Sequence, residues 1–284
     1  MKNLKLPERY NYAEAYLTFR CNLACDYCIN KFGKLKERDE LTAKEWINSL
    51  NKINFGDVSL TLGGGEPTLH KDFYKILNGL EHKIELLTNL KFNIDEFIEK
   101  ADRNKFTKSR IYHYHPIRIS YHAEQMEIEN TINKALKLMN SGFNVGIFGI
   151  RHPYTINENM AMSFACTKMR IPFYEKDFLG EVDGKIYGYY KYPKGLNPEF
   201  NDNGQLKEVK CRTRELLIAP NGDIHRCHRD LYKGEYPIGN IQGIRTLEDK
   251  FRPCSNYGEC NPCDLKLKTN KYLRNIECQI EIKE

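Results

Sequence analysis

The sequence predicts an α/β fold: an open, partial (β/α)6 barrel over residues 1–200, followed by a small cysteine-rich C-terminal domain with a β-hairpin over residues 201–284. Two observations predict it. Strand-like and helix-like runs alternate through residue 174, which indicates a parallel sheet with right-handed crossovers. Cysteines then recur from residue 211 to residue 278, beside an Asn-Gly pair that suits the type I′ turn of a hairpin.

The strands are expected where apolar, β-branched and aromatic residues cluster or alternate with polar ones. The first, residues 12–19, leads straight into a loop that contains three cysteines. Five further runs have strand character: residues 58–62, 84–89, 117–122, 145–150 and a run that begins with residues 171–174. In parallel barrels the active site lies at the carboxyl ends of the strands. The residues expected at those ends are Cys21, Glu66, Asn89, Ser120 and Arg151.

Helices are expected between these strands. Thr42 and Glu45 have the spacing of a capping box, so a helix should begin at this point. Residues 73–80 and 128–139 also have helical spacing. A later apolar stretch ends in Cys166, for which a buried and inert thiol is expected. As a hydrogen donor, this thiol would have to face the barrel interior.

Composition restricts the class of protein. A chain of 284 residues with 40% hydrophobic residues can bury a large core. The sequence contains neither an apolar run long enough to cross a bilayer nor a signal peptide at its start, so we expect a cytoplasmic protein without a membrane partner. Its ten cysteines are then metal ligands or free thiols rather than disulfides. The net charge of +6 is dispersed and does not indicate nucleic-acid binding.

Cys21, Cys25 and Cys28 follow the first strand with the spacing C-x3-C-x2-C. A 4Fe-4S cluster is usually held by a cysteine on each of its four irons, so three thiolates leave one iron open. An open position on a metal centre indicates catalysis, because a small molecule can enter it. The alternative is a zinc site completed by a distant residue, which would make the chain a non-enzymatic zinc-binding interaction protein.

A second motif follows the second expected strand: Gly64, Gly65, Glu66 and Pro67, preceded by Gly63. Glycines after a strand allow the backbone to pass close to a ligand, and a glutamate adds an acceptor suited to an ammonium group. By itself such a segment is more often a plain tight turn than a site. Its occurrence together with the cysteine motif points to one shared site.

The two motifs together resemble the signatures of the radical S-adenosylmethionine (SAM) enzymes. The resemblance implies an incomplete, TIM-like (β/α)6 barrel whose first loop carries a 4Fe-4S cluster on Cys21, Cys25 and Cys28. The open iron would chelate SAM, and the motif from Gly64 to Pro67 would hold its methionyl amino group. The reduced cluster would cleave SAM to a 5'-deoxyadenosyl radical that removes a hydrogen atom from the substrate. An electron donor such as flavodoxin or ferredoxin is implied as a partner.

The same resemblance matches two further strand-end residues, Asn89 and Ser120, to cofactor positions, and a third, Arg151, is a candidate from its place after the fifth strand. Asn89, in the pair Thr88-Asn89, would lie near SAM, with a plain turn former as the alternative. Ser120 would contact the methionyl carboxylate or the ribose, while its neighbour His122 is not assigned to the site. Arg151 would pair with a carboxylate of SAM or substrate, with an exposed arginine at the rim as the alternative.

The C-terminal cysteines form a second group. The pattern C-x10-G-x4-C at Cys211 and Cys227, followed by a cysteine cluster, resembles the twitch and SPASM domains, which carry auxiliary iron-sulfur clusters. The later SPASM pattern is incomplete here, so the simplest assignment is one auxiliary 4Fe-4S cluster. Its ligands would be Cys211, Cys227, Cys260 and Cys263, leaving Cys254 and Cys278 unassigned. The alternative is two clusters with three cysteines each.

The resemblance implies the reaction only in outline. Auxiliary clusters in this family pass electrons to or from a substrate radical, so an oxidation or dehydrogenation is favoured. No extra domain for a leader peptide is evident, so a small, sugar-like substrate is favoured over a peptide. A peptide maturase of the RiPP type or an epimerase is the alternative, and no residue is assigned as the catalytic group.

Overall fold

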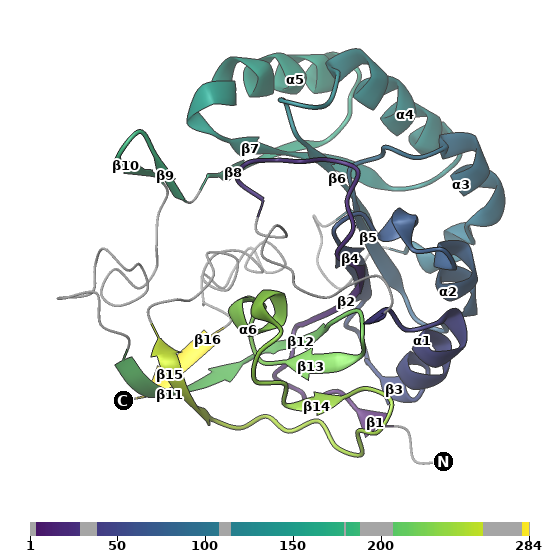
Figure 1. The fold of residues 1–284 in the computed structure, drawn as a ribbon. Coiled ribbons are helices and arrows are strands. Elements are labelled where there is room, and N and C mark those ends of the chain that lie inside the picture. The colour runs from purple at the N-terminus through teal and green to yellow at the C-terminus, as the bar shows by residue number, and fades with distance from the viewer. Residues whose placement is uncertain are drawn as a thin grey trace.

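The computed structural model describes residues 4–28, 39–107, 115–178, 180–187, 207–257 and 280–283. In these ranges the chain forms a curved sheet whose convex side is covered by helices (Figure 1). The nine described strands of this sheet, in spatial order, are β14 (Gly239–Asn240), β13 (Asp223–His225), β12 (Glu215–Ile218), β2 (Tyr12–Thr18), β4 (Leu60–Gly64), β5 (Ile84–Thr88), β6 (Ile117–Tyr121), β7 (Val145–Arg151) and β8 (Phe173–Asp177).

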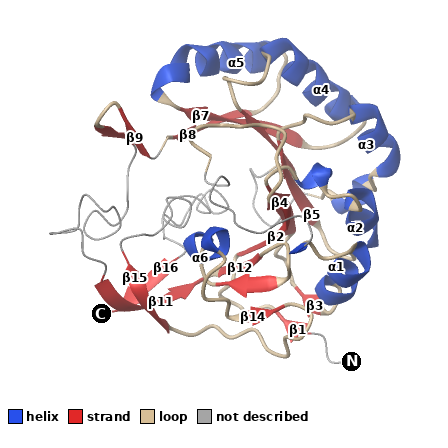
Figure 2. Cartoon of the chain, in the orientation of Figure 1, coloured by secondary structure: helices blue, strands red, loops and turns tan. Residues whose placement is uncertain are grey.

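The strands from β2 to β8 in this sheet are parallel, and each pairs with the next one along the chain. The helices that connect them lie on the outside of the arc (Figure 2): α1 (Ala43–Leu50), α2 (Phe73–Gly79), α3 (Ile94–Lys100), α4 (Ile128–Asn140) and α5 (Ile156–Lys168). This arrangement confirms an α/β fold with a mostly parallel central sheet, consistent with an open partial barrel. Among the described helices, none is long and apolar enough to cross a bilayer.

Side chains of β2 alternate between the two faces of the sheet. Ala13 and Leu17 pack against the outer helices in the main hydrophobic core. Tyr12 and Tyr16 pack against α6 (His228–Lys233). This helix lies on the concave side of the sheet (Figure 1). The apolar side chains on the outer face of the sheet form the core with the helices. Polar residues can therefore lie on the concave face and at the strand ends.

The capping box predicted for α1 is confirmed. Thr42 accepts a hydrogen bond from the Glu45 N–H at 3.4 Å, and the Glu45 carboxylate accepts one from the Thr42 N–H at 2.8 Å. The reciprocal bonds satisfy two N–H groups that the first helical turn leaves without a partner, so the helix begins after Thr42.

Cys166 is completely buried in the core between α5 and the sheet. Burial raises the pKa of its thiol to about 11. The thiol therefore stays protonated near neutral pH and packs as a small apolar group, which agrees with the inert role expected from the sequence.

The predicted hairpin is formed by β12 and β13, but its predicted type I′ turn is wrong. That turn requires a positive φ at both Asn221 and Gly222, and among these two only Gly222 has one (+85°). The Gly222 N–H donates to the Ala219 carbonyl at 2.8 Å, so Pro220 and Asn221 are the central residues. The fixed φ of proline suits the first central position of a type I turn, and this preference outweighs the Asn-Gly signal.

The hairpin extends the main sheet, because β12 lies parallel to β2 with Glu215 opposite Tyr12. The domain boundary expected at residue 200 lies outside the described residues, as do Cys260, Cys263 and Cys278. The remaining described strands form smaller sheets: β1 (Leu4–Lys5) with β3 (Ile53–Asn54), β9 (Gly180–Val182) with β10 (Lys185–Tyr187), and β11 (Lys207–Thr213) between β15 (Arg252–Tyr257) and β16 (Ile280–Lys283).

Candidate functional site

The cysteine loop, residues 21–28, follows the carboxyl end of β2. Cys25 is buried, Cys28 is half-buried and Cys21 is exposed. The Cys28 N–H donates to the Cys25 carbonyl at 3.0 Å, which folds the loop into a turn. Burial, followed by the neighbouring sulfurs of Cys28 and Cys21, raises the pKa of Cys25 to about 12. The three sulfurs therefore lie within electrostatic range, and as thiolates they would repel one another unless a cationic centre bound them.

The residue type of this loop bears on which metal it could hold. Three soft thiolates match the ligand type of iron-sulfur chemistry and of structural zinc alike. Among the described residues, no group of three or more His, Cys, Asp or Glu side chains is placed to hold one metal ion. A zinc site would need a fourth ligand beyond the three cysteines, whereas a four-iron cluster on three cysteines keeps one iron open.

The glycine loop, at the end of β4, packs on the residues that precede the cysteine loop. Gly64 has a φ of +126°, and a Cβ built on it would lie 2.1 Å from the Thr18 carbonyl oxygen. A Cβ on Gly65 would lie 2.2 Å from the Arg20 carbonyl oxygen. The Gly65 N–H donates to Thr18 and the Glu66 N–H to Arg20, both at 2.8 Å. Glycine permits this close approach, which brings the two sequence motifs together.

The Glu66 carboxylate is completely buried beside the end of β5. It accepts hydrogen bonds from Thr88 Oγ1, at 3.0 Å from each oxygen, and from the Asn89 N–H at 2.8 Å. Thr68 donates through its hydroxyl at 2.7 Å and its N–H at 3.2 Å, and the buried Pro67 opens a short 3-10 turn. Burial raises the pKa of Glu66, while these hydrogen bonds favour its ionised form. Glu66 thus ties the glycine loop to β5.

Asn89 links this unit to the cysteine loop. Its side chain is buried, and its Nδ2 lies 3.7 Å from Cys21 Sγ and 2.8 Å from Asn22 Oδ1. The structure therefore places the cysteine loop, the glycine loop and the end of β5 in one hydrogen-bonded unit at the carboxyl edge of the sheet. Cys21, Glu66 and Asn89 belong to it.

Ser120 and Arg151 lie further along the same edge. Ser120 is half-buried on β6, opposite Phe148 of β7. Arg151, the last residue of β7, has 53% of its side chain exposed and pairs with Glu175 of β8 at 3.3 Å. The structure thus places Arg151 at the rim, in the exposed position that the sequence left as the alternative.

An aromatic cluster beside the cysteine loop has no counterpart in the sequence predictions. The Tyr27 hydroxyl lies 2.9 Å from His122 Nδ1. The Tyr27 ring is 5.3 Å from that of His152, which lies 4.5 Å from Phe178. Burial lowers the pKa of His122 to about 4, so its imidazole is neutral near pH 7. These residues come from four segments, so no local pattern could have identified them.

Three C-terminal cysteines also lie together in the described part of the chain. Cys254 on β15 is opposite Val209, which places it diagonally across from Cys211 on β11. The hydrogen bond between the Cys211 thiol and Cys254 lowers the pKa of Cys254. The same bond and burial raise the pKa of Cys211, and the charge of Cys227 adds to this. The sequence left Cys254 unassigned, whereas the structure places it beside Cys211.

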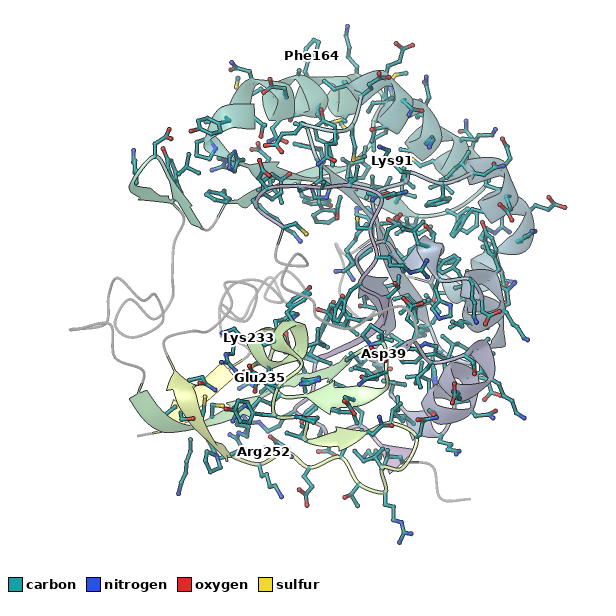
Figure 3. The ribbon with its side chains drawn as sticks, in the orientation of Figure 1. Asp39, Lys91, Phe164, Lys233, Glu235 and Arg252 are labelled. Atoms are coloured by element: carbon teal, nitrogen blue, oxygen red, sulfur yellow. The ribbon has the colours of Figure 1, made fainter. Side chains whose placement is uncertain are left out.

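Next to this group lies a cavity of about 660 Å³. Its lining includes Cys254 and the cationic side chains of Lys210, Arg226 and Arg252, the last of which is labelled in Figure 3. Arg226 is held in place by Asp230, whose carboxylate it contacts at 2.9 Å. The cavity therefore presents positive charge next to the cysteines.

Comparisons with known proteins agree with this geometry. The sequence profile described as "Radical SAM superfamily" matches residues 16–160, from β2 into α5. The fold is similar to SuiB of Streptococcus suis, with a TM-score of 0.55 and 18% identity over 84% of this chain and 64% of SuiB. It is also similar to anSMEcpe with bound AdoMet and Cp18Cys peptide, with a TM-score of 0.52 and 15% identity over 82% of this chain and 77% of that one.

Proposed function

Because the chain belongs to the Radical SAM superfamily, we propose that it binds a 4Fe-4S cluster and SAM at the carboxyl edge of β2, β4 and β5. When bound, these two groups supply an electron and a cleavable sulfonium, which together yield a 5'-deoxyadenosyl radical able to take a hydrogen atom from a substrate. Cys21, Cys25 and Cys28 would hold the cluster.

The remaining residues of the site would bind and orient SAM. Without side chains, Gly64 and Gly65 let their loop lie directly against Thr18 and Arg20. This contact would hold the loop beside the cluster, where it could meet the methionyl amino group. Glu66 would hold that backbone in place and contribute negative charge toward the ammonium. Ser120 would contact the methionyl carboxylate or the ribose. Arg151 would pair with a carboxylate of SAM or substrate, for which it would first have to exchange its contact with Glu175.

One observation carries this proposal: Asn89 contacts both motifs. Its backbone N–H donates to Glu66 at 2.8 Å, and its side-chain Nδ2 lies 3.7 Å from the sulfur of Cys21. A glycine loop that served only as a turn would not need a connection to cysteine sulfur. The connection supports a site in which a ligand bound by the glycine loop reaches a metal on the cysteines.

We further propose an auxiliary 4Fe-4S cluster at the C-terminal cysteines, with Cys254 as a ligand. Because Cys254 lies beside Cys211, we favour it as a ligand in place of one of Cys260 and Cys263, the two that the sequence assigned. Cys211, Cys227 and Cys254 would supply three thiolates, and one of the cysteines at 260, 263 and 278 the fourth. Such a cluster would accept an electron from a substrate radical, which supports an oxidation.

The substrate class has two candidates. The sequence favours a small, sugar-like molecule that is oxidised. The two similar proteins favour a peptide, because SuiB is found bound to the precursor peptide SuiA and anSMEcpe to the Cp18Cys peptide. We propose a peptide substrate on this ground. A cytoplasmic location and reduction by a flavodoxin or ferredoxin complete the proposal.

Anaerobic purification tests the metal content. The proposal expects a brown protein with about eight irons per chain, four in each cluster. A colourless protein that contains zinc would support the structural-zinc alternative instead. Deuterium transfer tests the substrate class: a deuterated peptide should pass its label to 5'-deoxyadenosine, whereas transfer from a deuterated sugar alone would favour the small molecule.

A further inference from the structure

We propose that Gln125 sets the reduction potential of the cluster on Cys21, Cys25 and Cys28 by donating a hydrogen bond to the sulfur of Cys25, with Asn89 acting in the same way on Cys21. This inference rests on the proposed function, since it requires a cluster at these cysteines. Neither amide would touch SAM or substrate in this role. Both would act through the sulfurs, as positioning residues.

Gln125 bridges two atoms of the cysteine loop. Its Oε1 accepts a hydrogen bond from the Ala24 N–H at 2.8 Å, and its Nε2 lies 3.3 Å from Cys25 Sγ. The backbone fixes which end of the amide faces the sulfur. Because the Ala24 N–H can only donate, the atom next to it must be the carbonyl oxygen, so the NH2 group must face Cys25.

The same reasoning orients Asn89. The N–H of Lys91, labelled in Figure 3, donates to Asn89 Oδ1 at 2.9 Å, so Nδ2 is the atom near the sulfur of Cys21. Asn22 donates to the Lys91 carbonyl at 2.8 Å, which turns its own oxygen toward Asn89 Nδ2. A closed set of hydrogen bonds therefore directs an N–H group at Cys21.

The segments that follow two neighbouring strands thus each place one side-chain amide beside a different cysteine sulfur. Asn89 follows β5, and Gln125 lies in the turn after β6, where its N–H donates to the His122 carbonyl at 3.0 Å. This turn is further held by the His122 N–H, which lies 3.3 Å from the sulfur of Met126. The amides are therefore in place before any ligand binds.

These hydrogen bonds would affect the reduction potential through the negative charge of the cluster. Reduction adds one negative charge to a cluster, and part of that charge lies on the cysteine sulfurs. An N–H group that points at a sulfur stabilises the more negative state, so it raises the reduction potential. The effect should be larger at Cys25, which is 8% exposed, than at the exposed Cys21, because less water screens it.

The test is an anaerobic redox titration of the full-length protein with SAM present, followed by electron paramagnetic resonance. SAM binding to the open iron marks the signal of this cluster. Gln125→Leu removes the whole bridge. Gln125→Glu keeps an acceptor for Ala24 and replaces only the N–H donor. Asn130→Leu, at an exposed amide on α4, is the matched control.

Both Gln125 variants should lower the midpoint potential, and the control should leave it unchanged. We expect the ratio of reduced to oxidised cluster at a fixed potential to fall roughly tenfold, which is about 59 mV for one electron. Gln125→Glu should shift it at least as far as Gln125→Leu, because its carboxylate adds negative charge. A purely structural role would lower iron content without moving the midpoint.

The outcomes separate the inference from the function on which it rests. Normal iron content and a normal signal with an unchanged midpoint in both Gln125 variants would overturn the tuning role and leave the proposed function intact. A wild-type protein without any SAM-sensitive signal would overturn the proposed function itself.

Discussion

Thr88 Oγ1 lies 3.0 Å from both carboxylate oxygens of Glu66. This contact joins the end of β5 to the glycine loop that follows β4. Because Asn89 comes next in the chain and faces Cys21, the carboxylate of Glu66 lies at the centre of the hydrogen-bonded unit that connects the two motifs. Its removal should therefore affect SAM binding more than iron binding.

Replacement of Glu66 by alanine should weaken SAM binding about tenfold, or ~1.4 kcal/mol, and leave the iron content unchanged. The N–H groups of the buried Asn89 and the half-buried Thr68 would lose their acceptor, which loosens the loop. Isothermal titration calorimetry measures the affinity, with Glu99→Ala at an exposed position of α3 as the control. Unaltered affinity would mean that the glycine loop does not bind SAM.

Gly64→Ala tests the close approach of the two loops. A Cβ at Gly64 would lie 2.1 Å from the Thr18 carbonyl oxygen, so the β4 end must shift away from β2. Gly184 also has a positive φ (+71°), but its Cβ would meet nothing within 4 Å. Gly184→Ala should therefore retain SAM binding. Its only effect should be backbone strain, which lowers the free energy of unfolding by about 1 kcal/mol in a thermal or chemical unfolding experiment. Gly64→Ala should abolish SAM binding, and equal affinities in the two variants would contradict this account.

Local patterns predicted much of the fold. The capping box of Thr42 and Glu45 depends on residues three apart, and the cysteine and glycine loops follow strands recognisable from their own composition. Parallel pairing then brings the strand ends to one edge. The sequence therefore indicated where a site should form.

Contacts between distant segments could not be predicted in this way. Gln125 and Cys25 are 100 positions apart, and no local spacing indicates that they meet. The pairing of β12 with β2 likewise depends on the whole sheet. At the hairpin the error was local: Pro220 fixes the backbone one residue before the Asn-Gly pair and shifts the turn.

Cys254→Ala tests the auxiliary cluster. If Cys254 is a ligand, the variant should lose up to about four irons while the signal of the SAM-binding cluster persists. Cys166→Ala removes a thiol that is buried in the hydrophobic core and belongs to neither cysteine group, so it is the control for a general loss of iron. Iron analysis together with electron paramagnetic resonance distinguishes loss of the auxiliary cluster from a general loss of iron. Full iron content in Cys254→Ala would return the ligand role to Cys260 and Cys263.

The stability of the fold should depend on pH through its buried histidines. The pKa of His122 is lowered from 6.5 to about 4 by burial, and burial also lowers the pKa values of His70, His82 and His225. Between pH 6.5 and about pH 4 the unfolded chain binds protons that the folded chain does not. The free energy of unfolding therefore has its full value above about pH 6.5 and decreases as the pH falls toward about 4.

Chemical denaturation at a series of pH values measures this effect, with His122→Gln as the variant. Glutamine can still bond the Tyr27 hydroxyl but does not titrate, so the free energy of unfolding should fall less steeply with decreasing pH than in the wild type. Identical slopes in the two proteins would show that His122 is not held neutral by the fold.

The formation of 5'-deoxyadenosine from SAM under anaerobic conditions with dithionite tests the central claim most directly. The reconstituted wild-type protein should produce it, and Cys25→Ala should not, because its three-cysteine site would lose a ligand. Cys166→Ala should retain the activity, since its thiol lies in the apolar core. Full activity in Cys25→Ala, or none in a wild-type protein that carries the cluster, would contradict the account.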